Sequence, residues 1–272
     1  MSAFSSPVHT AEIVTRLRAA GCVFAEDEAD LLVSAASTRE VLSAMVARRV
    51  AGEPLEHVLG RAEFCGLRVF VEPGVFVPRP RTEFLVRRAV ALARAAGGPP
   101  PVILDLCCGT GAMAAAVAAA VVKELGAGGA GAEVHAADLD PAAVRCARRN
   151  LPGAHVHQGD LFEPLPSSLR GRVGLLIASP PYVPSESIRL LPPEARRHEP
   201  LMALDGGGDG LDVARRVIAE APRWLAPGGH LLVETGERQA EATAAAVAAA
   251  GLRARAEWSE ELDATAVIGT RP

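Results

Sequence analysis

The chain is poor in aromatic residues, which make up only 4% of its 272 residues. Its interior must therefore be built from Ala, Val and Leu, and a hydrophobic content of 49% supplies enough of them for a packed core. The sequence has no apolar run of the roughly 18 residues that a membrane-spanning helix needs, and residues 1–10 lack the pattern of a signal peptide. These absences disfavour a disordered chain, a membrane protein and a secreted protein.

Paired cysteines and an excess of positive charge are also missing. The five cysteines are scattered without a CxxC pair, and adjacent Cys107 and Cys108 are poor disulfide partners. Reduced thiols and a cytoplasmic location are therefore expected. The net charge of -4 gives no overall attraction for nucleic acid, so a nucleic-acid substrate is not expected, although a local basic patch stays open.

The first half of the chain divides into helices and a hairpin. Apolar residues at helical spacing predict helices over 11–20 and 26–36 and a third helix capped by Thr38. We assign residues 1–52 to a helical domain, either a bundle without chemistry of its own or a module that docks the substrate. Residues 64–71 alternate like a strand and 72–74 form a turn signal, so we assign 53–80 to a hairpin linker.

From residue 81 onward the pattern predicts an α/β domain over 81–272. Strands and helices alternate, and the purely apolar run 175–178 indicates a strand buried on both faces. The fold class is an open, mostly parallel, doubly wound sheet. The expected strands are 102–105, 134–138, one around Val156, 175–178, 230–234, 253–257 and 266–270, and the expected helices are 82–95, one from Met113, 141–150, 211–224 and 237–250. We interpret the glycine-rich segment from Gly126 to Gly131 as a flexible connecting loop and not as a functional site.

A glycine-containing turn between the first of these strands and its helix predicts a nucleotide site. Glycines let the backbone approach a ligand, and the N-terminus of the helix offers free N–H groups. The candidate cofactor-binding residues of this turn are Asp105, Cys107, Cys108, Gly109, Thr110 and Gly111.

Two further acidic positions follow the next two strands. Asp138, followed by Leu139, can accept hydrogen bonds from both hydroxyls of a ribose, or it can be a helix cap or a turn residue. Asp160, followed by Leu161, can accept from the amino group of an adenine, or it can be a turn residue. All four residues are candidate cofactor-binding residues, and no metal ligand set is expected.

The most specific motif is Ser179-Pro180-Pro181-Tyr182, directly after the apolar strand. Two prolines remove two N–H donors and stiffen the backbone, so the last carbonyls of the strand point into the crevice at the ends of the strands. Tyr182 adds a flat face and a hydroxyl. Together these groups can hold a planar NH2 group and aim its nitrogen, so all four residues are catalytic candidates, and Ser179 also borders the cofactor.

With these motifs the chain resembles the protein-(glutamine-N5) methyltransferases, the HemK/PrmC-like enzymes that modify peptide chain release factors. The likeness runs from about Pro54 to Gly269 and includes the segments 54–60, 64–67, 77–83, 105–111, 159–162, 179–182 and 198–207, together with Asp138. The resemblance implies S-adenosylmethionine as cofactor, a Rossmann-like class I methyltransferase domain behind a helical domain and a hairpin linker, and a release factor as protein substrate. Within segment 77–83, Arg79 and Glu83 either take part in a salt bridge between domains or line the cofactor pocket.

Two residues depart from the pattern of that family. Cys107 stands where the family usually has glycine, which puts cofactor affinity in question. Ser179 stands where it usually has asparagine, and the related DNA methyltransferases that act on cytosine N4 use Ser-Pro-Pro-Tyr. Three alternatives therefore stay open: an N-methyltransferase for another protein, a natural product or a nucleobase; a non-catalytic binding module; and a nicotinamide-dependent oxidoreductase.

Overall fold

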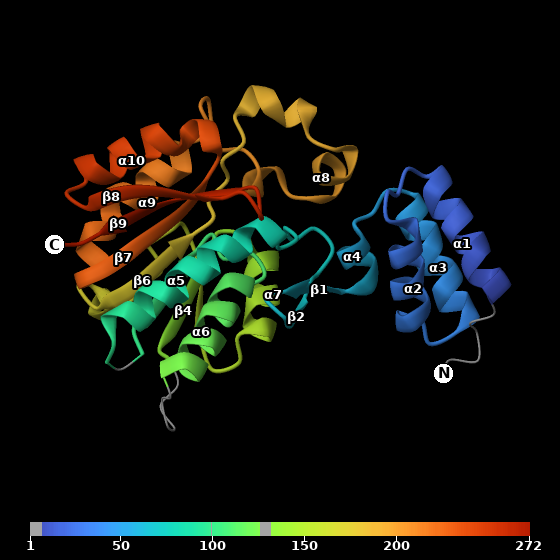
Figure 1. The fold of residues 1–272 in the computed structure, drawn as a ribbon, viewed down its shortest axis with the longest axis horizontal. Coiled ribbons are helices and arrows are strands. Elements are labelled where there is room, and N and C mark those ends of the chain that lie inside the picture. The colour runs from blue at the N-terminus through green and yellow to red at the C-terminus, as the bar shows by residue number, and fades with distance from the viewer. Residues whose placement is uncertain (1–6, 99, 126–131) are drawn as a thin grey trace.

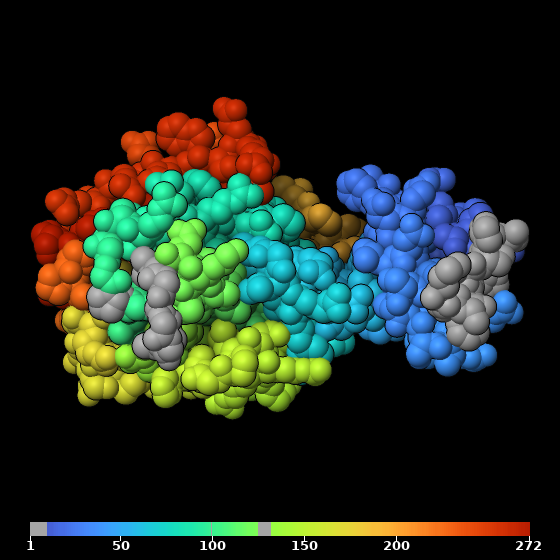
Figure 2. Space-filling model, turned by 60° about the horizontal axis from the view of Figure 1, so that its bottom comes forward, coloured from blue at the N-terminus to red at the C-terminus, as the bar shows by residue number. Residues whose placement is uncertain are grey.

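The computed structural model describes residues 7–98, 100–125 and 132–272, and it begins with a group of four helices. These are α1 (Pro7–Ala19), α2 (Ala25–Ala35), α3 (Arg39–Val50) and α4 (Leu55–Leu59). Leu17 and Leu32 are fully buried between them. The side chain of Thr38 accepts a hydrogen bond from the Val41 amide and caps α3, as the sequence predicted. In Figure 2 these blue helices stand apart from the main body of the molecule.

A two-stranded hairpin follows, but its turn is not where the sequence placed it. The strands β1 (Arg61–Phe64) and β2 (Leu67–Phe70) pair antiparallel. The expected single strand over 64–71 is wrong, because Cys65 and Gly66 adopt φ angles of 49° and 73° and reverse the chain between the two strands. The expected turn at 72–74 is also present, closed by a hydrogen bond from the Val75 amide to the Glu72 carbonyl.

The main body is a seven-stranded sheet with helices on both faces (Figure 1). Its strand order is β5-β4-β3-β6-β7-β9-β8; the first five strands are parallel, and β9 pairs antiparallel with both of its neighbours. The open, mostly parallel, doubly wound sheet is confirmed. The strands are β3 (Val102–Leu106), β4 (Val134–Asp138), β5 (His155–Gln158), β6 (Val173–Ala178), β7 (Leu225–Thr235), β8 (Arg253–Ser259) and β9 (Ala264–Thr270).

Alternating residues of the central strands contribute to two separate hydrophobic cores, one on each face of the sheet. Ile103 packs with α5 and α6 on one face, and Leu104 packs with α9 and α10 on the other. The helices of the body are α5 (Glu83–Ala96), α6 (Ala112–Leu125), α7 (Pro141–Asn150), α8 (Pro193–His198), α9 (Asp212–Trp224) and α10 (Ala240–Ala249). The 3₁₀ helices are η1 (Pro80–Thr82), η2 (Ser167–Leu169), η3 (Ser185–Leu190), η4 (Leu201–Ala203) and η5 (Glu237–Gln239).

The sequence predictions for this domain hold apart from element ends. The expected helix over 237–250 begins as the 3₁₀ turn η5, and β7 starts five residues before the expected strand. The glycine-rich loop over 126–131 lies outside the described residues. The domain boundaries after residues 52 and 80 stay predictions. Of the helices that the structure describes, none is long and apolar enough to span a bilayer.

Candidate active site

The turn after β3 has a backbone shape that suits glycine at three positions. Cys107, Gly109 and Gly111 have φ angles of 56°, 52° and 76°. At Gly111 a side chain has no room, since a Cβ atom there would lie 2.8 Å from the Cδ1 atom of Leu151. Of the three positions, only Cys107 carries a side chain. With its φ angle of 56° it holds a left-handed conformation that an L-residue adopts at a cost of about 1–2 kcal/mol. This strain is the physical reason why glycine suits position 107.

Asp105 anchors this turn from behind. It is fully buried, and its Oδ2 atom accepts a hydrogen bond of 3.0 Å from the Ala114 amide in the first turn of α6. Its Oδ1 atom has no hydrogen-bond partner, and burial raises the pKa of this carboxyl to about 8. Asp105 and Gly111 thus shape the turn, and neither is part of the cavity wall described below.

Asp138 closes the turn from the end of β4. Its two carboxylate oxygens accept the amides of Gly109, at 2.8 Å, and of Asp140, at 2.9 Å. Burial raises the pKa of Asp138. The alternative that Asp138 caps the next helix is wrong, because Asp140 caps α7 by accepting from the Ala142 amide. Asp138 does act as a turn residue through the Asp140 amide, and it also lines the cavity, where the remaining lone pairs of its carboxylate can accept hydrogen bonds.

Asp160 lies after β5 and already has a cationic partner. Its Oδ2 atom is 2.7 Å from a guanidinium nitrogen of Arg216 on α9. Both residues line the cavity together with Leu139, which is half exposed, and Leu161. Sequence reasoning missed Arg216 because nothing in the pattern of α9 distinguishes it from the neighbouring arginine.

The motif Ser179 to Tyr182 follows β6, and a later loop holds it in place. The Val183 amide donates to the Leu204 carbonyl at 3.0 Å, and the Val183 carbonyl accepts from the Gly206 amide at 2.9 Å. A Cβ atom at Gly206 would lie 2.6 Å from the Pro181 carbonyl oxygen. Gly206 is therefore needed for close packing against Pro181, while a side chain at Gly207 would collide with Asp212.

A buried carboxylate that sequence reasoning missed lies behind this motif. Glu234, near the end of β7, is 4% exposed. Its Oε2 atom accepts from the Thr82 hydroxyl at 2.9 Å, and its Oε1 atom accepts from the Tyr182 hydroxyl at 3.5 Å. Burial raises the pKa of Glu234, and neighbouring groups, among them the hydroxyl of Ser179 and the charge of Arg81, oppose that shift. The charge of Glu234 and burial together raise the pKa of Tyr182 to about 12.

The linker segment 77–83 and the loop after α8 form the wall opposite the turn. Glu199 accepts from the Val77 amide at 3.3 Å and from the Arg79 guanidinium at 2.5 Å. Arg79 does both of the things proposed for it, because it forms a salt bridge with Glu199 and lines the cavity, whereas Glu83 accepts from the Cys65 amide and does not line the cavity. Asn150 at the end of α7 joins the hairpin to the turn, because its amide group donates to the carbonyls of Phe70 and Thr110.

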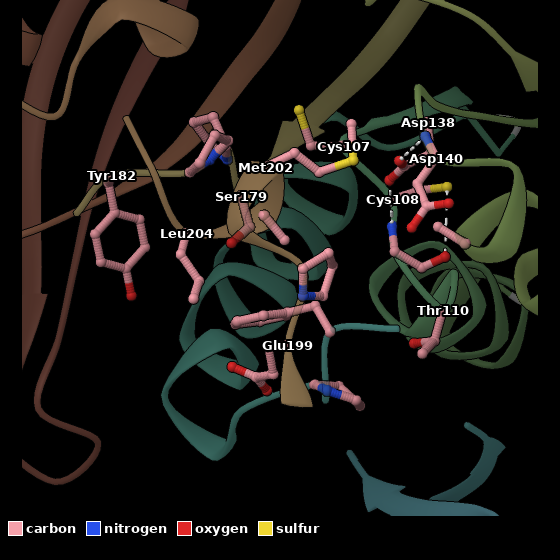
Figure 3. A pocket seen from close by; sticks show the side chains of 18 of the residues that line it. Cys107, Cys108, Thr110, Asp138, Asp140, Ser179, Tyr182, Glu199, Met202 and Leu204 are labelled. Carbon is pink, nitrogen blue, oxygen red and sulfur yellow. Dashed lines mark hydrogen bonds between the residues drawn. The ribbon is translucent and has the colours of Figure 1, made fainter. Parts of the chain in front are cut away.

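These groups surround one cavity of about 570 Å³. Figure 3 shows Cys108, Asp138 and Thr110 on one side of it and Ser179 and Tyr182 on the other, with Glu199 between them. Of the predicted site residues, those that line the cavity are Cys107, Cys108, Gly109, Thr110, Asp138, Leu139, Asp160, Leu161, Ser179, Pro180, Pro181 and Tyr182. Within the described ranges, no cluster of three His, Cys, Asp or Glu side chains is arranged to hold a metal ion.

The residues on the turn side fit a nucleoside cofactor. A Cβ atom at Gly109 would meet nothing within 4 Å, so the backbone there is open to a ligand. The first turn of α6 and the carboxylates of Asp138 and Asp160 border the same space, with donors and acceptors that suit a ribose and an adenine.

Comparisons with known proteins agree with this site. A family described as a methyltransferase domain matches residues 103–198. A methyltransferase structure from Pyrococcus furiosus superposes with a TM-score of 0.54 at 17% identity, covering 84% of this chain and 98% of that one. The fold and the site thus define a class I S-adenosylmethionine-dependent methyltransferase.

Sequence relatives show to which family of class I methyltransferases the chain belongs. A release factor glutamine methyltransferase from Streptomyces coelicolor is 44% identical over 72% of this chain and 67% of its own length. A 4-amino-L-phenylalanine/4-methylamino-L-phenylalanine methyltransferase from Streptomyces pristinaespiralis is 39% identical over 76% of this chain and 69% of its own length. The chain belongs to the release factor glutamine methyltransferase family, and the matched part spans about two thirds of each relative.

Proposed function

We propose that the protein methylates the side-chain amide nitrogen of a glutamine in a peptide chain release factor. The observation that carries this proposal is the match in sequence to release factor glutamine methyltransferases, together with the Ser-Pro-Pro-Tyr motif at the cavity wall that faces the cofactor side. Ser179, Pro180, Pro181 and Tyr182 all line the cavity there.

The cofactor half of the cavity would hold S-adenosylmethionine through the turn 107–111, Asp138, Leu139, Asp160 and Leu161. When bound, the cofactor supplies an electrophilic methyl group on a sulfonium. An amide nitrogen is a weak nucleophile because its lone pair is delocalised into the carbonyl. The enzyme must therefore orient that nitrogen toward the methyl group.

Ser179 and the carbonyl of Pro180 would each accept one proton of the amide NH2 group, while the ring of Tyr182 packs against its plane. This fixes the nitrogen with its lone pair aimed at the cofactor side of the cavity. The new N–C bond would form as the bond between the methyl carbon and the sulfonium sulfur breaks, which leaves a neutral thioether, and one of the two amide protons would pass to water. Orientation of this kind contributes on the order of 7–11 kcal/mol at best.

The helical domain supports a protein acceptor. Arg49 on α3 is mostly buried and pairs with Glu28 of α2 at 2.6 Å and with Glu194 of α8 at 2.9 Å. Glu194 lines the cavity, so the helical domain is tied to the acceptor wall. Of the two roles that the sequence left open, this link favours substrate docking. Five free thiols support a cytoplasmic location.

A second candidate acceptor is the aromatic amine of a small molecule. Ser179 is the reason to consider it, because the serine hydroxyl has a shorter reach than the asparagine amide usual in the family and does not reproduce its geometry. The relative from Streptomyces pristinaespiralis, whose name describes methylation of an arylamine, covers three quarters of this chain.

Mass spectrometry distinguishes the two candidates. The protein is incubated with S-adenosylmethionine carrying a labelled methyl group and either a purified release factor or 4-amino-L-phenylalanine. We expect the label on the glutamine of the Gly-Gly-Gln loop, and none on a release factor in which that glutamine is replaced by alanine. Label on the arylamine with an unlabelled release factor would replace the proposal with the second candidate.

A further inference from the structure

The buried carboxylate of Glu234 has no role in the mechanism given so far. It lies at the carboxyl end of β7, next to the strand that leads into Ser179. Because Ala178 of β6 is level with Val233 of β7 in this parallel pair, Ser179 and Glu234 follow at neighbouring positions of the two strands. The register alone therefore brings this carboxylate beside the acceptor motif.

The hydrogen-bond partners of Glu234 are hydroxyl groups. Thr82 donates to one carboxylate oxygen at 2.9 Å and Tyr182 to the other at 3.5 Å, and Ser179 lies close enough that its hydroxyl lowers the pKa of this carboxyl. Among the ion pairs of the described residues, none includes Glu234. The charge of Arg81 lowers the pKa of Glu234 without forming a salt bridge with it. A buried carboxylate outside any salt bridge is costly, so a hydrophobic residue would serve the core better at this position.

An ionised carboxylate can only accept hydrogen bonds, while a hydroxyl has one proton to give. A serine that donates its proton to Glu234 keeps both of its lone pairs for another donor. This solves the difficulty that serine presents in place of asparagine, since the hydroxyl then meets an acceptor N–H purely as a hydrogen-bond acceptor.

We propose that Glu234 is a positioning residue of the acceptor site: it takes the hydroxyl protons of Ser179 and Tyr182, so that the lone pairs of Ser179 face the N–H of the methyl acceptor. The inference rests on the proposed function only in that the acceptor nitrogen carries a proton toward Ser179. It applies equally to an amide and to an arylamine.

The first test uses Glu234→Gln, which replaces an oxygen acceptor by an amide donor and turns the hydroxyl protons away. We expect kcat to fall at least tenfold, while the Kd for S-adenosylmethionine stays within about twofold, because Glu234 is not part of the cavity wall. The matched control is Glu237→Gln, which removes the same charge from an exposed residue three positions later. Wild-type kcat in Glu234→Gln would overturn the proposal.

A double-mutant cycle separates positioning from a purely structural role. If Glu234 acts through Ser179, Glu234→Gln should lower kcat by less than threefold in a Ser179→Ala background. Full additivity of the two losses would contradict the proposal. If Glu234→Gln does not yield folded protein, Glu234→Asp takes its place in the cycle, since it keeps the charge but withdraws it from the hydroxyl groups.

A spectroscopic test needs no acceptor at all. Tyr182 is the only tyrosine of the chain, so the ultraviolet absorbance of phenolate reports on it alone. The pKa of Tyr182 is raised to about 12, and Glu234 is one cause, so Glu234→Gln should lower the ionisation midpoint while Glu237→Gln leaves it unchanged. An unchanged midpoint in folded Glu234→Gln would show that the carboxylate does not hold this hydroxyl.

The two proposals fail in different ways. An unlabelled release factor overturns the proposed substrate, but the tyrosine titration and a cycle run with 4-amino-L-phenylalanine still decide the role of Glu234. A labelled release factor with an additive cycle overturns the role of Glu234 alone.

Discussion

The two halves of the cavity each have a buried carboxylate behind their binding loop, and the two carboxylates differ. Asp105 stands behind the turn 107–111 and leaves one oxygen without a hydrogen-bond partner. Glu234 stands behind Ser179 to Tyr182 and has hydroxyl donors on both oxygens. The first carboxylate fixes the backbone of a turn, whereas the second orients side chains that face the acceptor.

The halves also differ in where their residues come from. The cofactor half is built at the ends of β3, β4 and β5, which follow one another along the chain and in the sheet. The acceptor half joins the linker 76–83, the loop after β6, α8 and the segment 198–207. The cofactor half therefore follows from the doubly wound fold, while the acceptor half depends on contacts particular to this family.

The largest expected effect concerns Asp105 and the pH dependence of stability. Burial raises its pKa from 3.8 to about 8, so between these values the folded protein keeps a proton that the unfolded chain releases. The contribution of Asp105 to stability therefore falls as pH rises from about 4 to 8, and no further above 8. Asp105→Asn lacks this contribution, so the difference in unfolding free energy between the two proteins should change by up to about 3–5 kcal/mol over this pH range. Denaturant unfolding at pH 5 and pH 8 measures it, and parallel losses in both proteins would contradict it.

A second prediction tests whether the acceptor half extends into the helical domain. Arg49→Ala leaves Glu28 and Glu194 without their shared cation, and breaking such a buried pair costs about 3–5 kcal/mol. We expect lower stability and a higher KM for a release factor. The Kd for S-adenosylmethionine serves as the control, because the cofactor half of the cavity does not contact α3. A KM for the release factor that stays at the wild-type value would contradict a docking role for the helical domain.

Asp138 tests the cofactor half directly. Asp138→Ala removes the acceptor for the ribose hydroxyls and the contacts to the Gly109 and Asp140 amides. The loss should be about 1.5–3 kcal/mol, or at least tenfold in the Kd for S-adenosylmethionine measured by calorimetry. Asp138→Asn keeps one oxygen acceptor and should show a smaller loss. Unchanged affinity in Asp138→Ala would remove Asp138 from the cofactor site.

The smallest effect is expected at Cys107. Cys107→Gly relieves a φ angle of 56° and removes a side chain from the cavity wall, at the cost of a more flexible unfolded chain. We expect the affinity for S-adenosylmethionine to stay equal or to improve, by about 1 kcal/mol at most. Cys108→Gly is the comparison at a neighbouring position. A large loss of affinity in Cys107→Gly would mean that the thiol makes a needed contact.

The sequence predicted the sheet and the places of the two loops because strand periodicity and turn residues are local patterns. It did not predict the hairpin turn, since nothing local indicates that Cys65 adopts a φ angle of 49°. It also missed Glu234 and Arg216, whose partners lie 52 and 56 residues away along the chain. Such partners are fixed by strand register and helix packing, which one sequence does not reveal.

The central claim is that one cavity has a cofactor half and a separate acceptor half that meet at Ser179. Its most direct test measures S-adenosylmethionine affinity and methyl transfer on the same preparation of Ser179→Ala, with Ser179→Asn beside it. We predict turnover at least tenfold lower in Ser179→Ala with the Kd for the cofactor nearly unchanged, and activity on the release factor glutamine kept or raised in Ser179→Asn. Loss of cofactor binding together with turnover in Ser179→Ala would contradict the division of the cavity.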